Sequence, residues 1–118
     1  MDENLYSFYS GLSEPMQGCF LALEKIILDF DERFHEAYKY SVPFFMIGDK
    51  NICYLWQHKN KKLAYIGFVD GGKIANPRSG KGKQEENEDF YNQIQKRDIP
   101  VDTIHDLLAE AVQLVEAR

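Results

Sequence analysis

The stretch SVPFFMIGDKNICYLWQHKNKKLAYIGFVDGGKI, residues 41–74, decides the fold. It contains three short runs rich in β-branched and aromatic residues: PFFMI, NICYLWQHK and KLAYIGFVD. Turn-forming residues end each run, at Gly48-Asp49, at an Asn-Lys-Lys sequence and at Gly71-Gly72. Short runs of this composition between turns predict an antiparallel β-meander.

Alternation along these strands predicts a sheet with two different faces. A two-residue turn after the second run pairs Leu55 with Ile66 and Trp56 with Tyr65. The face that contains Leu55 and Ile66 is apolar, so we expect it to lie under helices. The opposite face is predicted to carry mostly aromatic side chains with a polar tip: Ile52, Tyr54, Trp56, His58 and Tyr65.

A helix is predicted before the strands, over residues 13–30, with Ser13 as its N-cap. One apolar stripe runs along it at spacings of three and four: Met16, Phe20, Leu23, Ile27, Phe30 and Phe34. The stripe predicts that residues 29–38 continue the helix or form a second short one. This segment must end near Ser41, because Val42 precedes Pro43 and is excluded from the α region.

A second helix is predicted over residues 103–116, with Asp102 as its N-cap. Its buried stripe is Ile104, Leu107, Leu108, Ala111 and Val115. FYNQIQK, residues 90–96, is a candidate for one more strand, and the polar, charged segment 77–89 is predicted to be a mobile loop. The fold class is therefore α+β: a single domain, residues 1–118, in which a meander of three to five strands carries N- and C-terminal helices on one face.

The composition is that of a soluble globular domain, with 44% hydrophobic and 28% charged residues. The N-terminus is acidic and polar, unlike a signal peptide, and no apolar run is long enough to span a bilayer. Cys19 and Cys53 lie far apart in apolar runs, which favours buried thiols over a disulfide. We therefore expect a cytoplasmic protein without membrane contact.

Three blocks of the sequence resemble YdhG-like domains, small bacterial α+β proteins. They are YSVPFFMIGDKNICYLW, KLAYIGFVDGGKI and DIPVDTIHDLLAEAV, and the resemblance covers residues 13–75 and 98–115. It implies an antiparallel sheet backed by N- and C-terminal helices. Some members are described as frataxin-like iron chaperones, which implies a comparable role here. Ser41 and Val42 depart from the Gly-Met that often precedes the family's proline.

The aromatic sheet face is the leading candidate for function. Its residues, with two more at its rim, form the predicted ligand-binding set: Tyr40, Pro43, Tyr54, Trp56, His58 and Tyr65. Aromatic rings with polar tips suit a half-exposed surface that receives a small molecule or a protein. The leading hypothesis is thus a non-enzymatic binding domain without a cofactor. A structural or dimerising role, in which a second copy buries the same face, is a further alternative, so the chain is expected to be a monomer or a homodimer.

A loosely bound Fe(II) is the alternative that the resemblance implies. On a continued helix, the segment DERFHE would place Asp31, Glu32, His35 and Glu36 close together, and carboxylates and imidazole suit Fe(II). A solvated acidic helix end explains the same residues without a metal, and we favour that interpretation.

Neither catalysis nor nucleic-acid binding has comparable support. The cysteines lack a histidine nearby in the sequence, and no nucleophile motif is present. Residues 37–83 hold nine bases and two acids, and with the aromatic residues they raise the possibility of single-stranded nucleic acid. The pI of about 5.1 and the clustering of Lys59, Lys61 and Lys62 in one turn argue against it.

Overall fold

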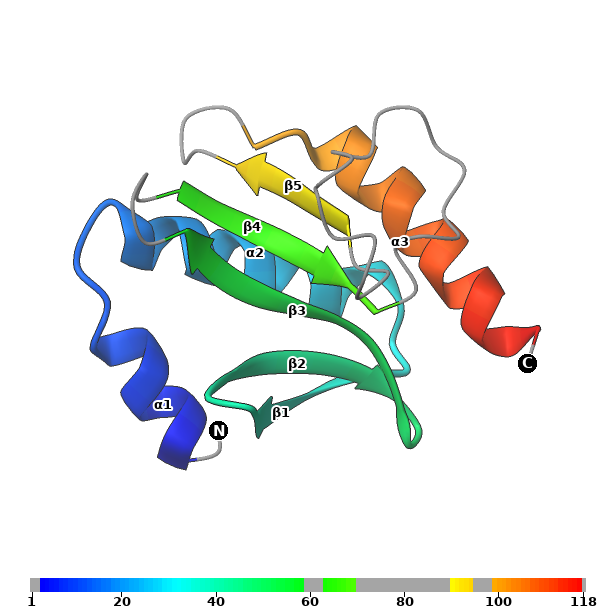
Figure 1. Cartoon of the computed structure of the whole chain (residues 1–118), viewed down its shortest axis with the longest axis horizontal. Coiled ribbons are helices and arrows are strands. Elements are labelled where there is room, and N and C mark those ends of the chain that lie inside the picture. Colours follow the sequence, from blue (N-terminus) through cyan, green and yellow to red (C-terminus); the bar gives the residue numbers. More distant parts are fainter. Residues whose placement is uncertain (1–2, 59–62, 70–89, 95–98, 118) are drawn as a thin grey trace.

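A computed structural model describes residues 3–58, 63–69, 90–94 and 99–117. These residues form three helices and five strands (Figure 1). In chain order the elements are α1 (Glu3–Ser10), α2 (Met16–Phe30), β1 (Phe34–Lys39), β2 (Val42–Ile47), β3 (Lys50–His58), β4 (Leu63–Phe68), β5 (Phe90–Ile94) and α3 (Val101–Glu116). The predicted α+β class is confirmed. The predicted mobile loop, residues 77–89, lies outside the described residues.

The strands form one antiparallel sheet in the order β1-β2-β3-β4-β5, so each strand pairs with its neighbours in sequence. Figure 1 shows this consecutive order, with α2 behind the central strands. The predicted register of the central hairpin is confirmed, because Leu55 pairs with Ile66 and Trp56 with Tyr65. The candidate strand at FYNQIQK is β5, which pairs with β4.

The core lies between one face of the sheet and the helices. On the sheet side, Phe45, Leu55 and Ile66 are fully buried. The predicted helix stripes supply the other side: Phe20, Leu23 and Ile27 from α2, and Ile104, Leu107, Leu108, Ala111 and Val115 from α3. In this arrangement the apolar stripes of the helices and the apolar face of the sheet bury each other.

A β-bulge changes the predicted face of Ile52. Between β2 and β3 the register shifts, so that Phe45 pairs with Cys53 while Met46 pairs with Asn51. Ile52 is thereby the extra residue of β3, and strict alternation fails at such a point. Ile52 joins Cys53 in the buried cluster under the helices, so its assignment to the opposite face was wrong.

The helical continuation predicted for residues 29–38 is wrong after Phe30. Asp31 leaves the helix with extended backbone angles, φ −149° and ψ 128°. Its carboxylate then accepts a hydrogen bond from the backbone N–H of Arg33, and its carbonyl accepts one from Phe34. These bonds form a tight turn that starts β1, so Phe34 extends the apolar stripe from a strand.

The helix starts also differ from the predicted caps. α2 begins at Met16, and Glu14 rather than Ser13 covers its first turn, because the Glu14 carboxylate accepts the N–H of Gly18 at 3.0 Å. α3 begins at Val101, which places Asp102 inside the first turn. There its negative charge still interacts favourably with the positive end of the helix dipole.

Helix α1 was not predicted. It is short, and it buries Leu5 and Tyr9 in the common core while the rings of Phe8 and Phe20 lie 5.8 Å apart. A helix of this length is marginal on its own, so these contacts with α2 and the sheet stabilise it.

Candidate functional site

The sheet face that points away from the helices carries a row of aromatic rings. Phe44 and Tyr54 are register partners on β2 and β3, and their ring centroids lie 5.0 Å apart in a stacked arrangement. The ring of Tyr40 lies 5.5 Å from that of Phe44. Together with Trp56, these residues form what we call the aromatic face: Tyr40, Phe44, Tyr54 and Trp56.

Gly67 provides space for the ring of Tyr54 on β4. The two residues are register partners, and a Cβ atom at Gly67 would collide with the Tyr54 ring. Because glycine leaves no side chain in the way, the row extends from the β1–β2 turn across β2 and β3 to β4. The aromatic face is therefore built into the strand register.

Tyr40 stands at the most exposed end of the row, with 82% of its surface accessible. Tyr40 and Ser41 form the two-residue turn between β1 and β2, and both have positive φ values, 53° and 68°. A two-residue hairpin of the type I′ class requires this backbone and normally takes Asn or Gly there. A tyrosine in this conformation is strained, which makes its presence informative.

Trp56 follows Tyr54 by two residues and is 36% exposed, as predicted for a ring that points away from the helices. Its register partner Tyr65 and the strand end at His58 belong to the described backbone. The orientation of the His58 and Tyr65 side chains lies outside the described part of the structure. Their predicted ligand-binding role stays a prediction.

Pro43 does not belong to the aromatic face. It is buried in β2, and alternation places it on the side of its neighbour-but-one Phe45, which faces the helices. Phe44, the residue that does join the row, was missed. The signal was available, since Phe44 and Pro43 must point to opposite faces and only one of them can accompany Tyr54.

Lys39 crosses the same part of the sheet. Its ammonium group donates a hydrogen bond to the side-chain oxygen of Asn51 at 3.1 Å. Lys39 belongs to β1 and Asn51 to β3, so the lysine side chain spans the intervening strand β2. Lys39 pairs with Val42, so by alternation its side chain is on the same side of the sheet as Phe44.

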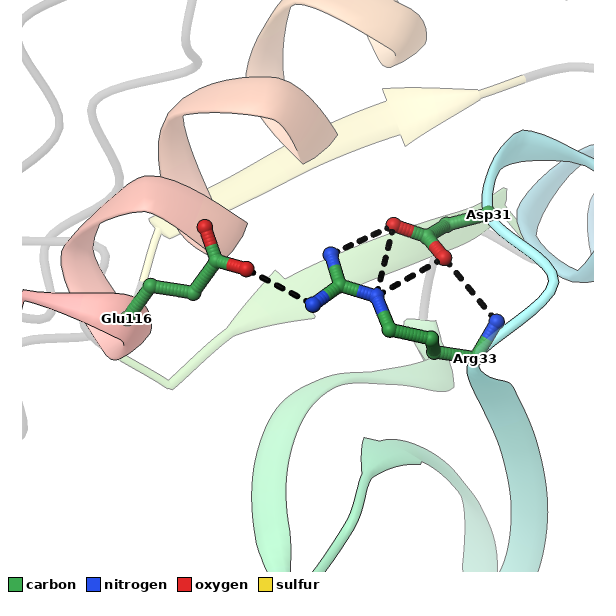
Figure 2. A network of polar contacts seen from close by, with 3 residues as sticks. All are labelled: Asp31, Arg33 and Glu116. Atoms are coloured by element: carbon green, nitrogen blue, oxygen red, sulfur yellow. Dashed lines mark hydrogen bonds and ion pairs between the residues drawn. The ribbon is translucent and has the colours of Figure 1, made fainter.

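The predicted metal ligands do not form a group. Asp31 is engaged by Arg33, whose guanidinium donates to both carboxylate oxygens at 2.8–3.3 Å and also reaches Glu116 of α3 at 2.7 Å (Figure 2). The hydrogen bonds from Arg33 lower the pKa of Asp31 to about 2. The Asp31 carboxylate is thus part of an ion-pair network that links the turn between α2 and β1 to the end of α3.

The remaining three residues are separated because they lie in the turn and in β1, where neighbours alternate in direction. His35 bonds through Nε2 to the carbonyl of Gly48 at 2.9 Å. Glu36 points to the helices and accepts a hydrogen bond from Tyr9 at 2.6 Å, while Glu32 is exposed in the preceding turn. Across the described residues, no group of three histidine, cysteine or acidic side chains has metal-binding geometry. The helical arrangement predicted for the set is wrong.

Both cysteines are buried, as predicted, and the structure, which describes both, contains no disulfide between them. Burial in the apolar core raises the pKa of the Cys53 thiol well above its ordinary value. A thiol of this kind is a poor nucleophile at neutral pH, because the thiolate is the reactive form.

Comparison of the chain with models of protein families, with curated proteins and with solved structures gives no significant match. Among the described helices, none combines the length and the apolar character that crossing a membrane requires.

Proposed function

We propose that this chain is a non-enzymatic binding domain whose aromatic face receives a protein partner or a small ligand. The observation that carries the proposal is the row in which Tyr40, Phe44 and Tyr54 follow one another at 5.0–5.5 Å. Tyrosine and tryptophan offer a large apolar surface with few rotatable bonds and a hydrogen-bonding group at the rim. Such residues dominate the energetics of binding surfaces.

The conformation of Tyr40 gives the proposal further support. A left-handed backbone costs a non-glycine residue about 1–2 kcal/mol, and asparagine or glycine at this turn would avoid most of that cost. Strained residues concentrate at functional sites. An 82% exposed ring at a hairpin tip contributes little to the core, so a role in contact with a partner accounts for its presence. A ring that projects in this way favours a protein partner over a small ligand.

The experiment is an NMR titration of the ¹⁵N-labelled protein, with Trp56 fluorescence in parallel. The protein is titrated with a fragment library and with a panel of peptides. We expect amide shifts to concentrate at Tyr40, Phe44, Tyr54 and Trp56, and Tyr40→Ala to weaken the interaction at least tenfold. Tyr6→Ala is the matched control, because Tyr6 is an exposed tyrosine, 64% accessible, on α1. Equal effects of the two substitutions would refute the proposal.

Two other roles predict different outcomes of the same titration. If the resemblance to YdhG-like domains extends to a frataxin-like iron chaperone, Fe(II) added under anaerobic conditions should broaden resonances of residues 29–36. If the domain is a dimerisation module, the aromatic face should shift with protein concentration alone. The resemblance is the sole support for the iron role, since the candidate ligands point in different directions.

A further inference from the structure

Strand β1 forms one border of the described sheet, because β2 is the only strand that pairs with it (Figure 1). Its residues 35–39 are all at least partly exposed, whereas residues 42–46 of β2 are buried. Helix α1 reaches β1 from the helix side, since the Tyr9 hydroxyl donates to the Glu36 carboxylate at 2.6 Å. In the described part of the structure, the outer border of β1 is therefore open to solvent.

The register of the β1–β2 hairpin shows which backbone groups face this open border. Lys39 and Val42 flank the two-residue turn, and such a pair exchanges backbone hydrogen bonds in both directions. Bonded and non-bonded pairs alternate along an antiparallel ladder. Glu36 and Tyr38 therefore belong to non-bonded pairs, and their N–H and C=O groups point away from β2.

Two neighbouring contacts support this assignment. Tyr38 lies opposite Pro43, which has no N–H and cannot complete a bonded pair. Phe34, two residues before Glu36, donates its N–H to the carbonyl of Asp31 and not to β2. No other backbone group of the described residues bonds to the outward groups of Glu36 and Tyr38. These groups are free to pair with an added strand.

The side chains of β1 do not protect this border. His35, Glu36 and Lys39 each bond to a group of their own chain on the inner side of the strand. The strand contains no proline, and its pairing with β2 runs without a bulge. Natural sheets protect their edges with outward lysines, prolines or bulges. An edge that has free backbone groups and none of these features is a template for a further strand.

The charge of Lys39 favours a foreign strand over a second copy of this chain. Its ammonium bonds to the neutral side chain of Asn51 and forms no ion pair among the described residues. Two β1 strands that pair about a two-fold axis through Glu36 and Tyr38 groups place an alanine, a histidine or an arginine opposite Lys39, and never a carboxylate. The net charge of −5 also makes two copies repel each other.

We propose that the outer border of β1 receives an extended segment of a partner protein as an additional antiparallel strand. The backbone groups of Glu36 and Tyr38 bond to this segment. Lys39 turns from Asn51 to a carboxylate of the segment, because a charged pair is stronger than a bond to a neutral amide. A β-branched residue of the segment packs beside Tyr38, which is 36% exposed. The inference is independent of the proposed function, since these three β1 residues lie outside the aromatic face.

The probe is a synthetic peptide, acetyl-Thr-Glu-Val-Thr-Val-Thr-amide. In antiparallel register its glutamate lies opposite Lys39 and its valines opposite Tyr38 and Glu36. Amide hydrogen exchange and NMR titration of the ¹⁵N-labelled full chain measure the interaction. In the free protein we expect the amides of Glu36 and Tyr38 to exchange rapidly, while those of Ala37 and Lys39 are protected. Saturating peptide should protect Glu36 and Tyr38 as well.

Three variants test the two parts of the proposal. Tyr38→Pro removes an outward N–H and no β1–β2 bond, so the fold should persist while peptide binding is lost. Lys39→Met should weaken binding about two- to fivefold and remove the preference for this peptide over one with lysine in place of glutamate. Lys50→Met, at an exposed lysine of β3, is the matched control and should leave binding unchanged.

Several outcomes would overturn the proposal. They are a peptide that leaves the Glu36 and Tyr38 amides unprotected, equal affinities of the glutamate and lysine peptides, and a Tyr38→Pro variant that unfolds or still binds. If protection of these two amides rises with protein concentration alone, the occupant is a second copy and the foreign strand is wrong. Tyr40→Ala should leave peptide binding at this border unchanged. Shifts confined to the aromatic face would contradict the edge while leaving the proposed function intact.

Discussion

At the residue scale, Gly67 decides whether the aromatic row can form. A side chain at this position would occupy the space that holds the Tyr54 ring. We predict that Gly67→Ala displaces the ring and destabilises the protein by about 1–3 kcal/mol, as overpacking does. Urea unfolding measures the cost. In a Tyr54→Ala background, Gly67→Ala should lower the free energy of unfolding much less than it does in the native protein. If the effects of the two substitutions simply add, the proposed contact is contradicted.

Tyr40 presents the opposite case, a residue that lowers stability where it stands. We predict that Tyr40→Asn raises the free energy of unfolding by about 1 kcal/mol, because asparagine tolerates the left-handed backbone far better than tyrosine does. The same variant should bind the partner of the aromatic face more weakly. Thermal and urea unfolding give the first value, and the NMR titration gives the second. A lower free energy of unfolding would show that the contact of the Tyr40 ring with Phe44 stabilises the protein by more than the backbone strain destabilises it.

At the element scale, the turn at Asp31 marks both the success and the limit of sequence reasoning. The spacing of Phe20, Leu23 and Ile27 identified α2 correctly because apolar periodicity reflects burial directly. Phe34 fits the same spacing, yet it reaches the core from β1. Periodicity cannot distinguish the two cases, since either backbone places Phe34 on the buried side. The decisive signal was local: Asp31 bonds the N–H of Arg33 and ends the helix.

The candidate site was predictable in part for a similar reason. Register and alternation placed Trp56 opposite Tyr65 and away from the helices, because a period of two and a short turn leave one solution. They failed at Ile52, where a bulge adds a residue. At Pro43 alternation would have given the right side, because Phe44 and not Pro43 pairs with Tyr54 on β3. Helix α1 depends on tertiary contacts between distant segments, which no local pattern in the sequence indicates.

The turn that begins β1 is also linked to α3 through Arg33, which bridges Asp31 and Glu116. We predict that Arg33→Met returns the pKa of Asp31 from about 2 to the ordinary range near 4. Because the pKa of Asp31 is lowered, its ion pair with Arg33 stabilises the fold at pH values above the ordinary pKa. This stabilisation is lost as pH falls toward 2. NMR titration of the Asp31 carboxyl group measures the change. Glu116→Gln should alter it far less, because the Asp31–Arg33 hydrogen bonds remain.

At the scale of the whole molecule, the sheet separates the helices from the aromatic face. All described helices pack on one face, where the main core cluster lies, and the aromatic face occupies the other. The main core cluster lies on the helix side, although Val42, Phe44 and Met46 of β2 are also buried, at 4–7% exposure, on the side of the aromatic face. Along β3, substitutions on the two faces should have different consequences. Adjacent residues of β3 test this separation directly, because Leu55 and Trp56 differ in direction but share one strand.

We predict that Leu55→Ala lowers the free energy of unfolding by about 2–5 kcal/mol, since it leaves a cavity under the helices. Leu55 is fully buried, whereas Trp56 is 36% exposed. Trp56→Ala should therefore cost clearly less stability, although it removes a larger side chain, and it should abolish binding at the aromatic face. Urea unfolding followed by far-ultraviolet circular dichroism compares both variants without relying on the tryptophan signal. If the two substitutions destabilise the protein equally, the aromatic face is a second core layer, and its proposed role in binding is wrong.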